Sequence, residues 1–455
     1  MKSTLAAFAS ACGGRLAGAD RSFTGVSTDT RTLVAGDLFV ALRGPRFNGG
    51  EFVGAAHAAG AAGALVSAAE QVPLAQIVVP DTLAALTSAA VRWRGAFDQP
   101  LIGVAGSNGK TTVKEMIAAI LGQAGAVLAT RGNLNNHIGV PVTLMRLEPA
   151  HRFAVIEMGA NHAGEVAALV RIARPTIGLI TNAGAEHLEG FGSLEGVARA
   201  EGETLEGLEP GATAIINADD QFAALWRGLT RARVVTFGAV QPADFAAEGV
   251  RTDIGAGGFV TRFELVCPSG RRPIELRLAG RHNVVNALGA AAAAVSAGAT
   301  LDHVAAGLAT MRAVQGRLQF KVGRSGAWIV DDSYNANPSS MRAGIDVLAD
   351  LPGRRWLVMG DMAELGEFAA ASHAEIGAYA RERGIERLFA TGKLAALAAE
   401  SFGHGAQWYP DTESLAQALD VAVTSDVRLL VKGSRVNRLE RVVDALAAVT
   451  SGRKA

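Results

Sequence analysis

The sequence predicts an α/β protein of three domains with a mostly parallel sheet in its central domain. Its 455 residues suggest three domains of about 150 residues each, and an apolar content of 49% is that of a globular protein. From residue 101 onward, apolar runs typical of buried strands alternate with helical patterns, and a new alternation begins near Val314. We therefore expect a central sheet of the P-loop type and a Rossmann-like C-terminal domain.

The domain boundaries are placed where the sequence pattern changes. Residues 1–98 hold short strands and two alanine-rich helices, and the Asp-Gln-Pro tripeptide at 98–100 is typical of a linker. The central domain then spans residues 99–312, and the C-terminal domain spans residues 313–455. The segment from about 240 to 280 is rich in strand-forming residues and glycine, which predicts an antiparallel insertion or edge.

Charge and cysteine content argue against several classes of partner. The 43 basic and 43 acidic side chains balance, so nothing points to nucleic acid or to an acidic membrane surface. The 2 cysteines are too few for a disulfide framework and favour a reducing cytoplasm. Met1–Cys12 has the pattern of a helix rather than of a signal peptide. Ala290–Ala299 is too short to span a bilayer and is predicted to be a buried helix. We expect a cytoplasmic protein that binds neither membrane nor nucleic acid.

Residues 101–112, LIGVAGSNGKTT, are the most informative segment. A buried strand, a glycine turn and a helix start would point backbone N–H groups at phosphate oxygens, while a lysine adds charge and a threonine hydroxyl reaches Mg²⁺. Val104 stands where a standard P-loop has its first glycine, and the competing interpretation is an ordinary strand-to-helix turn. The residues expected at the phosphates are Gly106, Ser107, Asn108, Gly109, Lys110, Thr111 and Thr112.

Several other apolar runs end in polar residues at the same relative place. Open parallel sheets bind ligands at the carboxyl ends of their strands, although every buried strand must also end somewhere polar. We favour the ligand-binding interpretation. The residues at these ends are Glu157, Thr181-Asn182, Asn217, Asp331-Asp332, Gly360-Asp361 and Lys432-Gly433-Ser434.

A series of longer motifs runs along nearly the whole chain. These motifs are GNLNNHIG (132–139), EMGANH (157–162), TNAGAEH (181–187), GRHNVVN (280–286), GR (316–317), DDSYNANP (331–338), GDMAELG (360–366) and KGSR (432–435). Together they resemble the Mur ligases of peptidoglycan synthesis, and STDTR (27–31) with GDLFVAL (36–42) is similar to the family's nucleotide-sugar domain. GNLNNHIG and DDSYNANP favour the member that joins D-alanyl-D-alanine to UDP-N-acetylmuramoyl-tripeptide.

The resemblance implies an ATP-dependent amide ligase. A substrate carboxylate attacks the γ-phosphate of ATP, and an amine then displaces phosphate from the acyl phosphate. By this resemblance, Lys110 holds the β- and γ-phosphates, Thr111 and Glu157 bind the first Mg²⁺, and His187 binds a second one. Taken without the resemblance, a histidine after a strand is more often structural.

Six further side chains receive a role from the resemblance. Asn283 matches a contact to the ATP base, with a helix N-cap as the alternative, and Arg317 matches a clamp on the phosphates. The C-terminal domain brings Asp332 and Asn337 to ATP. The acyl phosphate is steadied by Asn135 or Asn136.

One position departs from the family pattern. Where the family typically has Ala-Lys-Gly-Glu with a carbamylated lysine at a metal, this chain has Ala-Glu-Gly-Glu, with Glu201 at the lysine position. A glutamate already carries a carboxylate, but on a shorter stem. Glu201 is a candidate second-metal ligand, directly or through a water, and a surface-helix glutamate is the alternative.

One set of alternatives lies within the ligase class, and one alternative lies outside it. Sister Mur ligases and folylpolyglutamate synthase share the loop, but the Asp-Asn-Pro-Arg motif of a diaminopimelate-adding sister is absent. A P-loop switch would need an Asn-Lys-x-Asp motif, which is also absent. We expect a monomer that grips ATP between its second and third domains. Whether the third peptide residue is diaminopimelate or lysine stays open.

Overall fold

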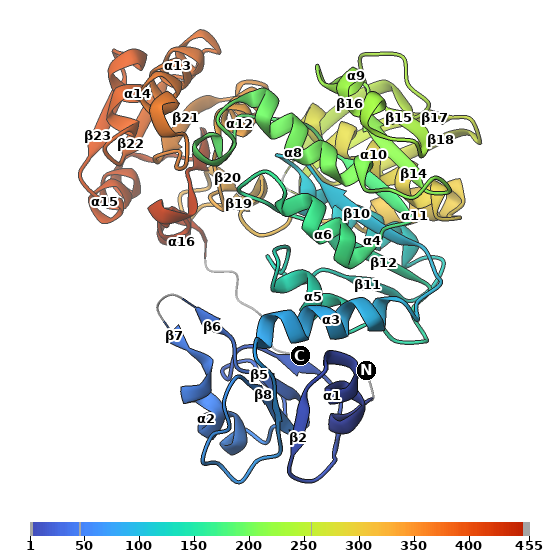
Figure 1. Cartoon of the computed structure of the whole chain (residues 1–455). Helices are drawn as coiled ribbons and strands as arrows, with labels where there is room; N and C mark the ends of the chain where they lie inside the picture. Colours follow the sequence, from blue (N-terminus) through green and yellow to red (C-terminus); the bar gives the residue numbers. More distant parts are fainter. Residues whose placement is uncertain (1–2, 45–46, 256, 449–455) are drawn as a thin grey trace.

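The computed structural model describes residues 3–44, 47–255 and 257–448. Three α/β units follow one another along the chain (Figure 1). The N-terminal unit lies at the bottom of this view, the central unit at the upper right and the C-terminal unit at the upper left. The expected mixed α/β fold with largely parallel sheets is confirmed.

The N-terminal unit is built on a five-stranded sheet. Its strands run in the order β2 (Arg15–Ala17), β9 (Gln76–Val78), β8 (Gly63–Val66), β5 (Leu38–Val40) and β4 (Val26–Ser27), and only β2 is antiparallel to its neighbour. The remaining elements are β1 (Ser3–Thr4), α1 (Leu5–Cys12), β3 (Ser22–Phe23), β6 (Arg43–Gly44), β7 (Phe47–Asn48), η1 (Gly49–Phe52), α2 (Val53–Ala58) and α3 (Thr82–Arg94).

Helix α3 joins this unit to the central one. Trp93 donates its indole N–H to the carbonyl of Leu147 at 3.0 Å. The guanidinium of Arg94, only 7% exposed, donates to the carbonyls of Ala173 (2.7 Å) and Arg174 (2.8 Å), where a helix of the central unit ends. A cation at a helix C-terminus satisfies carbonyls that have no partner within the helix. The two units therefore share one apolar core.

The central unit contains a six-stranded, fully parallel sheet. Its order is β11 (Val127–Ala129), β12 (Phe153–Glu157), β10 (Leu101–Ala105), β13 (Ile177–Ile180), β14 (Thr213–Asn217) and β15 (Arg233–Phe237). Every residue of β10, β12 and β13 is buried, because helices cover both faces of a parallel sheet. This explains why the strands are continuous apolar runs in the sequence.

Each face of the central sheet has its own helices. One face packs against α4 (Lys110–Leu121), α10 (Arg281–Ser296) and α11 (Leu301–Thr310). The alanines of α10 are fully buried there, as expected for a buried helix. The other face is covered by α5 (Gly139–Leu144), α6 (Glu165–Ala173), α8 (Leu194–Glu206) and α9 (Ala223–Leu229), with the short α7 (Leu188–Phe191) at its edge.

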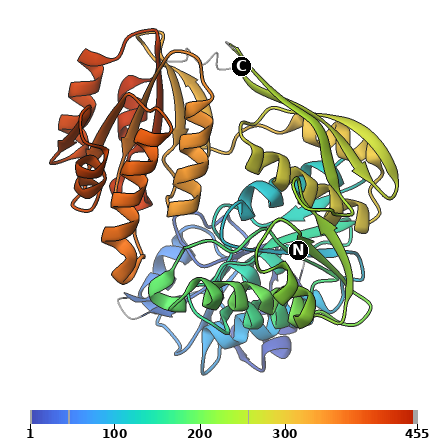
Figure 2. The same ribbon diagram turned by 90° about the horizontal axis from the view of Figure 1, so that it is seen from above.

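The expected antiparallel insertion is present. Strands β16 (Ala246–Gly255), β17 (Gly258–Cys267) and β18 (Gly270–Leu276) form a separate three-stranded antiparallel sheet. Figure 2 shows its long hairpin extending towards the C-terminal unit. There the ring of Phe259 meets Phe320 edge to face, with centroids 6.0 Å apart.

The C-terminal unit is a second six-stranded sheet with helices on both faces. Only β19 is antiparallel. The order is β19 (Gln319–Val322), β20 (Trp328–Asp332), β24 (Val427–Lys432), β21 (Arg354–Met359), β22 (Arg387–Thr391) and β23 (Ala406–Tyr409). Its helices are α12 (Pro338–Ala349), η2 (Gly366–Phe368), α13 (Ala369–Glu382), α14 (Ala395–Phe402), α15 (Thr412–Ala422), η3 (Arg435–Asn437) and α16 (Glu440–Leu446).

Across the described residues, no helix is both long enough and apolar enough to cross a membrane.

Candidate active site

A cavity of about 570 Å³ lies between the central and C-terminal units. It is bounded by the carboxyl ends of β12 and β13, the segment after β10, and the ends of β20 and β24. Of the polar residues predicted at strand ends, Glu157, Asn182, Asp332 and Lys432 line it. Asn217 instead donates its side-chain amide to the carbonyl of Thr181 at 2.8 Å and supports the wall from behind.

The phosphate loop between β10 and α4 needs glycine at two places. Gly106 and Gly109 have φ angles of +120° and +84°. A Cβ on Gly106 would lie 2.1 Å from Thr181 Oγ1, and one on Gly109 would lie 2.6 Å from Asn286 Oδ1. Both conformation and space therefore require these glycines.

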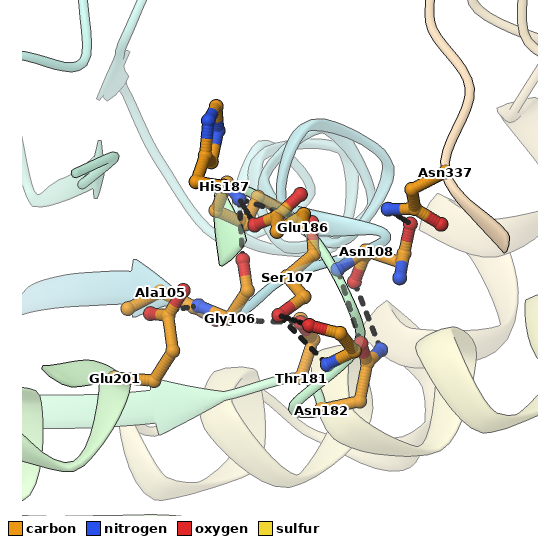
Figure 3. A network of polar contacts seen from close by, with 12 residues as sticks. Ala105, Gly106, Ser107, Asn108, Thr181, Asn182, Glu186, His187, Glu201 and Asn337 are labelled. Atoms are coloured by element: carbon orange, nitrogen blue, oxygen red, sulfur yellow. Dashed lines mark hydrogen bonds and ion pairs between the residues drawn. The ribbon is translucent and has the colours of Figure 1, made fainter. Parts of the chain in front are cut away.

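The turn of the loop is held by the segment that follows β13 (Figure 3). Asn182 accepts from Asn108 N and donates to Asn108 O, both at 3.0 Å. Ser107 N donates to Asn182 O at 2.9 Å, and Ser107 Oγ accepts from Gly184 N at 2.8 Å. The N–H groups of the first turn of α4 have no acceptor within the helix, so the prearranged loop presents them to an anion. Ser107–Thr112 all line the cavity, whereas Gly106 does not.

Lys110 is folded back over this loop. Its Nζ donates to two loop carbonyls, one of them that of Ser107 at 3.1 Å, and pairs with Glu186 Oε1 at 3.1 Å. Burial lowers the pKa of Lys110, but the carboxylates of Glu186, Glu201 and Glu157 more than offset this and raise the pKa above its ordinary value. The raised pKa favours the charged ammonium form, and Lys110 lines the cavity.

Glu157, at the end of β12, is the centre of a buried polar cluster. Its Oε1 accepts from Thr111 Oγ1 at 3.2 Å and from Asn135 Nδ2 at 2.9 Å. Among the described residues, its buried Oε2 has no hydrogen-bond donor. The fully buried Lys114 lies 3.7 Å from that oxygen and donates to the carbonyl of Thr130 at 2.8 Å.

The pair of Thr111 and Glu157 fits a hard divalent cation. A hydroxyl oxygen lies beside a carboxylate that keeps one oxygen without a hydrogen-bond donor, and Mg²⁺ prefers such oxygen ligands while retaining waters and phosphate oxygens. In the described part of the chain, no group of three or more His, Cys, Asp or Glu side chains is arranged to hold a metal ion. Ligands from substrate and water would therefore have to complete the site.

The structure does not bring the other two predicted metal ligands to this point. His187 lines the cavity, and its Nδ1 lies 2.6 Å from Glu364 Oε2 of the C-terminal unit. Glu201 is buried beneath the loop, where its Oε2 accepts from Gly106 N at 2.7 Å, and it does not line the cavity. The surface-helix alternative for Glu201 is wrong, since the residue is only 5% exposed.

The burial of Glu201 predicts a pH-dependent stability. Desolvation raises its pKa from 4.5 to about 7, against the opposing charge of Lys110. The stabilisation by the protonated form is therefore complete below about pH 4.5 and is lost as the pH rises through about 7. Glu201→Gln keeps an acceptor for Gly106 N–H without a charge. In the absence of metal, we expect the free energy of unfolding of the variant to exceed that of the parent by up to about 3 kcal/mol above pH 7. Near pH 4.5 the two values should differ little. Calorimetry at both pH values checks this, and a pH-independent difference would contradict it.

Two residues of the C-terminal unit reach the phosphate loop. Arg317 donates to Thr111 Oγ1 at 3.2 Å, and its guanidinium lies over the ring of Tyr334, 4.5 Å from the centroid. Asn337 caps α12 and also donates its Nδ2 to Asn108 Oδ1 at 2.9 Å. Both predicted side chains are therefore adjacent to the loop.

The remaining predicted residues take different places. Asn283 lines the cavity, and the N-cap alternative for it is wrong because the cap is Gly280. Asp332 also lines the cavity, with its Oδ2 paired to Lys432 Nζ at 2.6 Å. Asn136 lines it too, but its Oδ1 accepts from the first N–H groups of the segment that leads into α5. Of the two asparagines left open, only Asn135 contacts Glu157.

Four contact residues have no assigned role in the sequence-based prediction, namely Lys114, Glu186, Tyr334 and Glu364. Lys114 had a local signal, because it follows Lys110 by one helical turn and lies among the apolar positions of α4. Glu186, Tyr334 and Glu364 stand inside quoted motifs, but only the tertiary fold shows which side chains they meet.

Comparison with known protein families covers most of the chain. Residues 22–100 match the Mur ligase family catalytic domain, residues 104–294 the Mur ligase middle domain, and residues 316–435 the Mur ligase glutamate ligase domain.

Individual relatives agree with this. The UDP-N-acetylmuramoyl-tripeptide–D-alanyl-D-alanine ligase of Escherichia coli is 44% identical over 97% of this chain and 98% of its own length. Crystal structure I of MurF from Acinetobacter baumannii superposes with a TM-score of 0.90 at 32% identity, covering 98% of both chains. MurF from Thermotoga maritima, solved in complex with ADP, has a TM-score of 0.79 at 26% identity, covering 92% of this chain and 96% of its own. The chain belongs to the Mur ligase family.

Proposed function

We propose that this protein is an ATP-dependent ligase that joins D-alanyl-D-alanine to UDP-N-acetylmuramoyl-tripeptide in the cytoplasm, in peptidoglycan precursor synthesis. The observation that carries this is the convergence of Lys110, the Thr111–Glu157 pair and Arg317 on one cavity between two units. Relatives that bear this activity in their names cover nearly the whole chain. ATP and Mg²⁺ are the cofactors.

The reaction divides into two transfers. An oxygen of the tripeptide carboxylate forms a bond to the γ-phosphorus of ATP, and the bond to the β,γ-bridging oxygen breaks, which releases ADP. The amine of D-alanyl-D-alanine then attacks the acyl carbon, the carbon–oxygen bond to phosphate breaks, and the amine loses a proton. Phosphate departs with the oxygen that came from the carboxylate.

The residues of the cavity supply positioning and charge. Lys110 exchanges its loop carbonyls and Glu186 for β- and γ-phosphate oxygens, and Arg317 neutralises the charge that spreads over the transferring group. Thr111 and Glu157 would hold Mg²⁺, which would offset negative charge on the phosphates when it is bound. Asn135 beside Glu157 is suited to steady the acyl phosphate.

A second Mg²⁺ site with His187 and Glu201 remains a prediction. It would require Glu201 to leave Gly106 N–H, or to act through a water. Glu201→Gln removes the negative charge at constant size, so it should raise the Mg²⁺ concentration needed for half-maximal turnover. If the variant has the parent's Mg²⁺ dependence, Glu201 does not bind the second Mg²⁺, and its role is to accept the hydrogen bond from Gly106 N in the phosphate loop.

The three units have separate tasks in this proposal. Residues 1–98 bind the UDP-sugar, residues 99–312 bind ATP, and residues 313–455 close over it and carry Arg317, Asp332 and Asn337. Closure of a third unit excludes water from the acyl phosphate. We propose a monomer without nucleic-acid or membrane partners.

The coupling of phosphate release to both substrates tests the function. Purified protein with ATP and Mg²⁺ should release phosphate at a sustained rate only when UDP-N-acetylmuramoyl-tripeptide and D-alanyl-D-alanine are both present. A P-loop switch would hydrolyse the nucleotide without either. Equal phosphate release with and without the dipeptide would contradict the ligase assignment.

The ring under Arg317 should matter for turnover. Tyr334→Ala removes the surface on which the guanidinium lies, and we expect kcat to fall about five- to tenfold, as the loss of a cation–π contact of about 1 kcal/mol implies. Tyr334→Phe keeps the ring and should stay within twofold of the parent. Tyr379 is a matched control, because Arg342 lies 4.4 Å from its ring centroid outside the cavity. Steady-state kinetics check the set, and a Phe variant as slow as the Ala variant would contradict the role of the ring.

A further inference from the structure

Two strained residues meet across the boundary between the central and C-terminal units. His187 and Glu364 have φ angles of +48° and +65°, in the left-handed region that side chains other than glycine rarely adopt. The His187 Nδ1 and the Glu364 Oε2 lie 2.6 Å apart. Strain of this kind persists only where the surrounding structure fixes it, and it is concentrated at functional sites.

The backbone on the central side is held by α7. The carbonyl of His187 accepts from Gly190 N at 2.9 Å and Phe191 N at 3.1 Å, so the residue begins this short helix. Its ring also packs edge to face on Phe191, with centroids 6.5 Å apart. The imidazole thus projects from a fixed backbone, and its residue lines the cavity.

The backbone on the C-terminal side is held by its own unit. Met362 N donates to the buried His373 Nε2 at 2.8 Å, and Ala363 N donates to Ser434 Oγ at 2.9 Å. Leu365, which follows Glu364, is 1% exposed. The loop that carries Glu364 is therefore part of the C-terminal unit, and the carboxylate reaches His187 only where the two units are together.

The pairing selects one tautomer of the neutral imidazole ring. A carboxylate is an acceptor only, so it requires a proton on Nδ1, and in the neutral ring this leaves Nε2 as the acceptor. Proteins orient histidines that bind cations by donating the other ring N–H to a carboxylate. Here that carboxylate comes from a different unit than the histidine.

We propose, on the basis of the ligase function above, that Glu364 is a positioning residue which fixes the Nδ1–H tautomer of His187 when the C-terminal unit closes. The imidazole then presents Nε2 as a lone-pair donor only in the closed molecule, and its acceptor would be the second Mg²⁺ predicted above rather than the cation at Thr111 and Glu157. The hydrogen bond from His187 Nδ1–H to Glu364 Oε2 therefore couples closure to the tautomer that leaves Nε2 unprotonated. Glu364 itself touches no reacting atom.

The test compares Glu364→Ala, which removes the acceptor, with Glu364→Gln, whose amide oxygen still accepts from Nδ1–H. Glu367→Ala is the matched control, because it changes an exposed glutamate three residues further along the same segment. Two measurements use the full chain with a non-hydrolysable ATP analogue: the ¹⁵N shifts of the His187 ring and the affinity for Mn²⁺ by electron paramagnetic resonance. Steady-state kinetics with ATP then give kcat and KM.

We expect Glu364→Ala to lower kcat and Mn²⁺ affinity about tenfold or more, to leave KM for ATP within twofold, and to mix the two tautomers in the ¹⁵N spectrum. Glu364→Gln should retain a single tautomer and more than a third of kcat, and Glu367→Ala should match the parent. An unchanged His187 spectrum in Glu364→Ala, or a Gln variant as impaired as the Ala variant, would overturn the proposal. The spectrum and the Mn²⁺ affinity do not depend on turnover, so a failure of the ligase assignment would be recognised separately.

Discussion

Lys110→Ala is expected to reduce ligation roughly 100- to 1000-fold while the fold is retained. Lys110 contributes a charge that acts mainly on the transferring phosphoryl group, and the loss of one such prearranged group costs about 3–4 kcal/mol of activation free energy. Glu186, its present partner, lines the cavity and can be hydrated once the ammonium is gone. Single-turnover formation of ADP and the circular dichroism spectrum of the variant measure the two effects.

The chain supplies a matched control for this variant. Lys393 also follows a buried strand and a glycine, in Thr391-Gly392-Lys393, but it is exposed and lies outside the cavity. Lys393→Ala should therefore turn over like the parent. A folded Lys110→Ala variant with near-parental turnover would show that the loop does not hold the transferred phosphate.

Lys114→Met is expected to have the largest effect on stability. The Lys114 ammonium is fully buried, donates to Thr130 O and forms an ion pair with Glu157 Oε2 at 3.7 Å. Removal of one partner from a buried ion pair leaves the other charge uncompensated, which typically costs 3–5 kcal/mol. For a domain of this size that corresponds to a decrease of roughly 6–20 °C in the calorimetric transition of the central unit.

A double-mutant cycle isolates the contact. Lys114→Met combined with Glu157→Gln removes both charges and should recover much of the loss, because no buried carboxylate is left unpaired. Glu115, the exposed partner of Lys114, serves as control, and Glu115→Gln should cost under about 1 kcal/mol. Additive effects of the two buried substitutions would mean that Lys114 does not compensate Glu157.

Features set by local sequence could be predicted. The strand, turn and helix from 101 to 121 follow from an apolar run, two glycines and an amphipathic period, and the structure has β10, the loop and α4 there. The antiparallel insertion near 240–280 and the buried alanine helix were predicted on the same grounds. Such patterns can be recognised locally, because the burial of one or both faces of a strand or helix determines where apolar residues stand along it.

Features set by tertiary packing could not be predicted. Glu201 lies 95 positions beyond Gly106, and only the packing of α8 beneath the loop brings its carboxylate to that N–H group. The contact of His187 with Glu364 depends on how two units are placed, which no periodicity encodes. Lys114 lies among the apolar positions of α4, but only the packing of the sheet and of α10 and α11 shows that its ammonium is enclosed beside Glu157.

The fate of one oxygen atom tests the central claim most directly. UDP-N-acetylmuramoyl-tripeptide labelled with ¹⁸O in the carboxylate that is joined would be turned over with unlabelled ATP and D-alanyl-D-alanine, and the released phosphate analysed by mass spectrometry. Formation of an acyl phosphate predicts one ¹⁸O atom in each phosphate released. Phosphate free of ¹⁸O, at a yield of amide product equal to that of ADP, would contradict it.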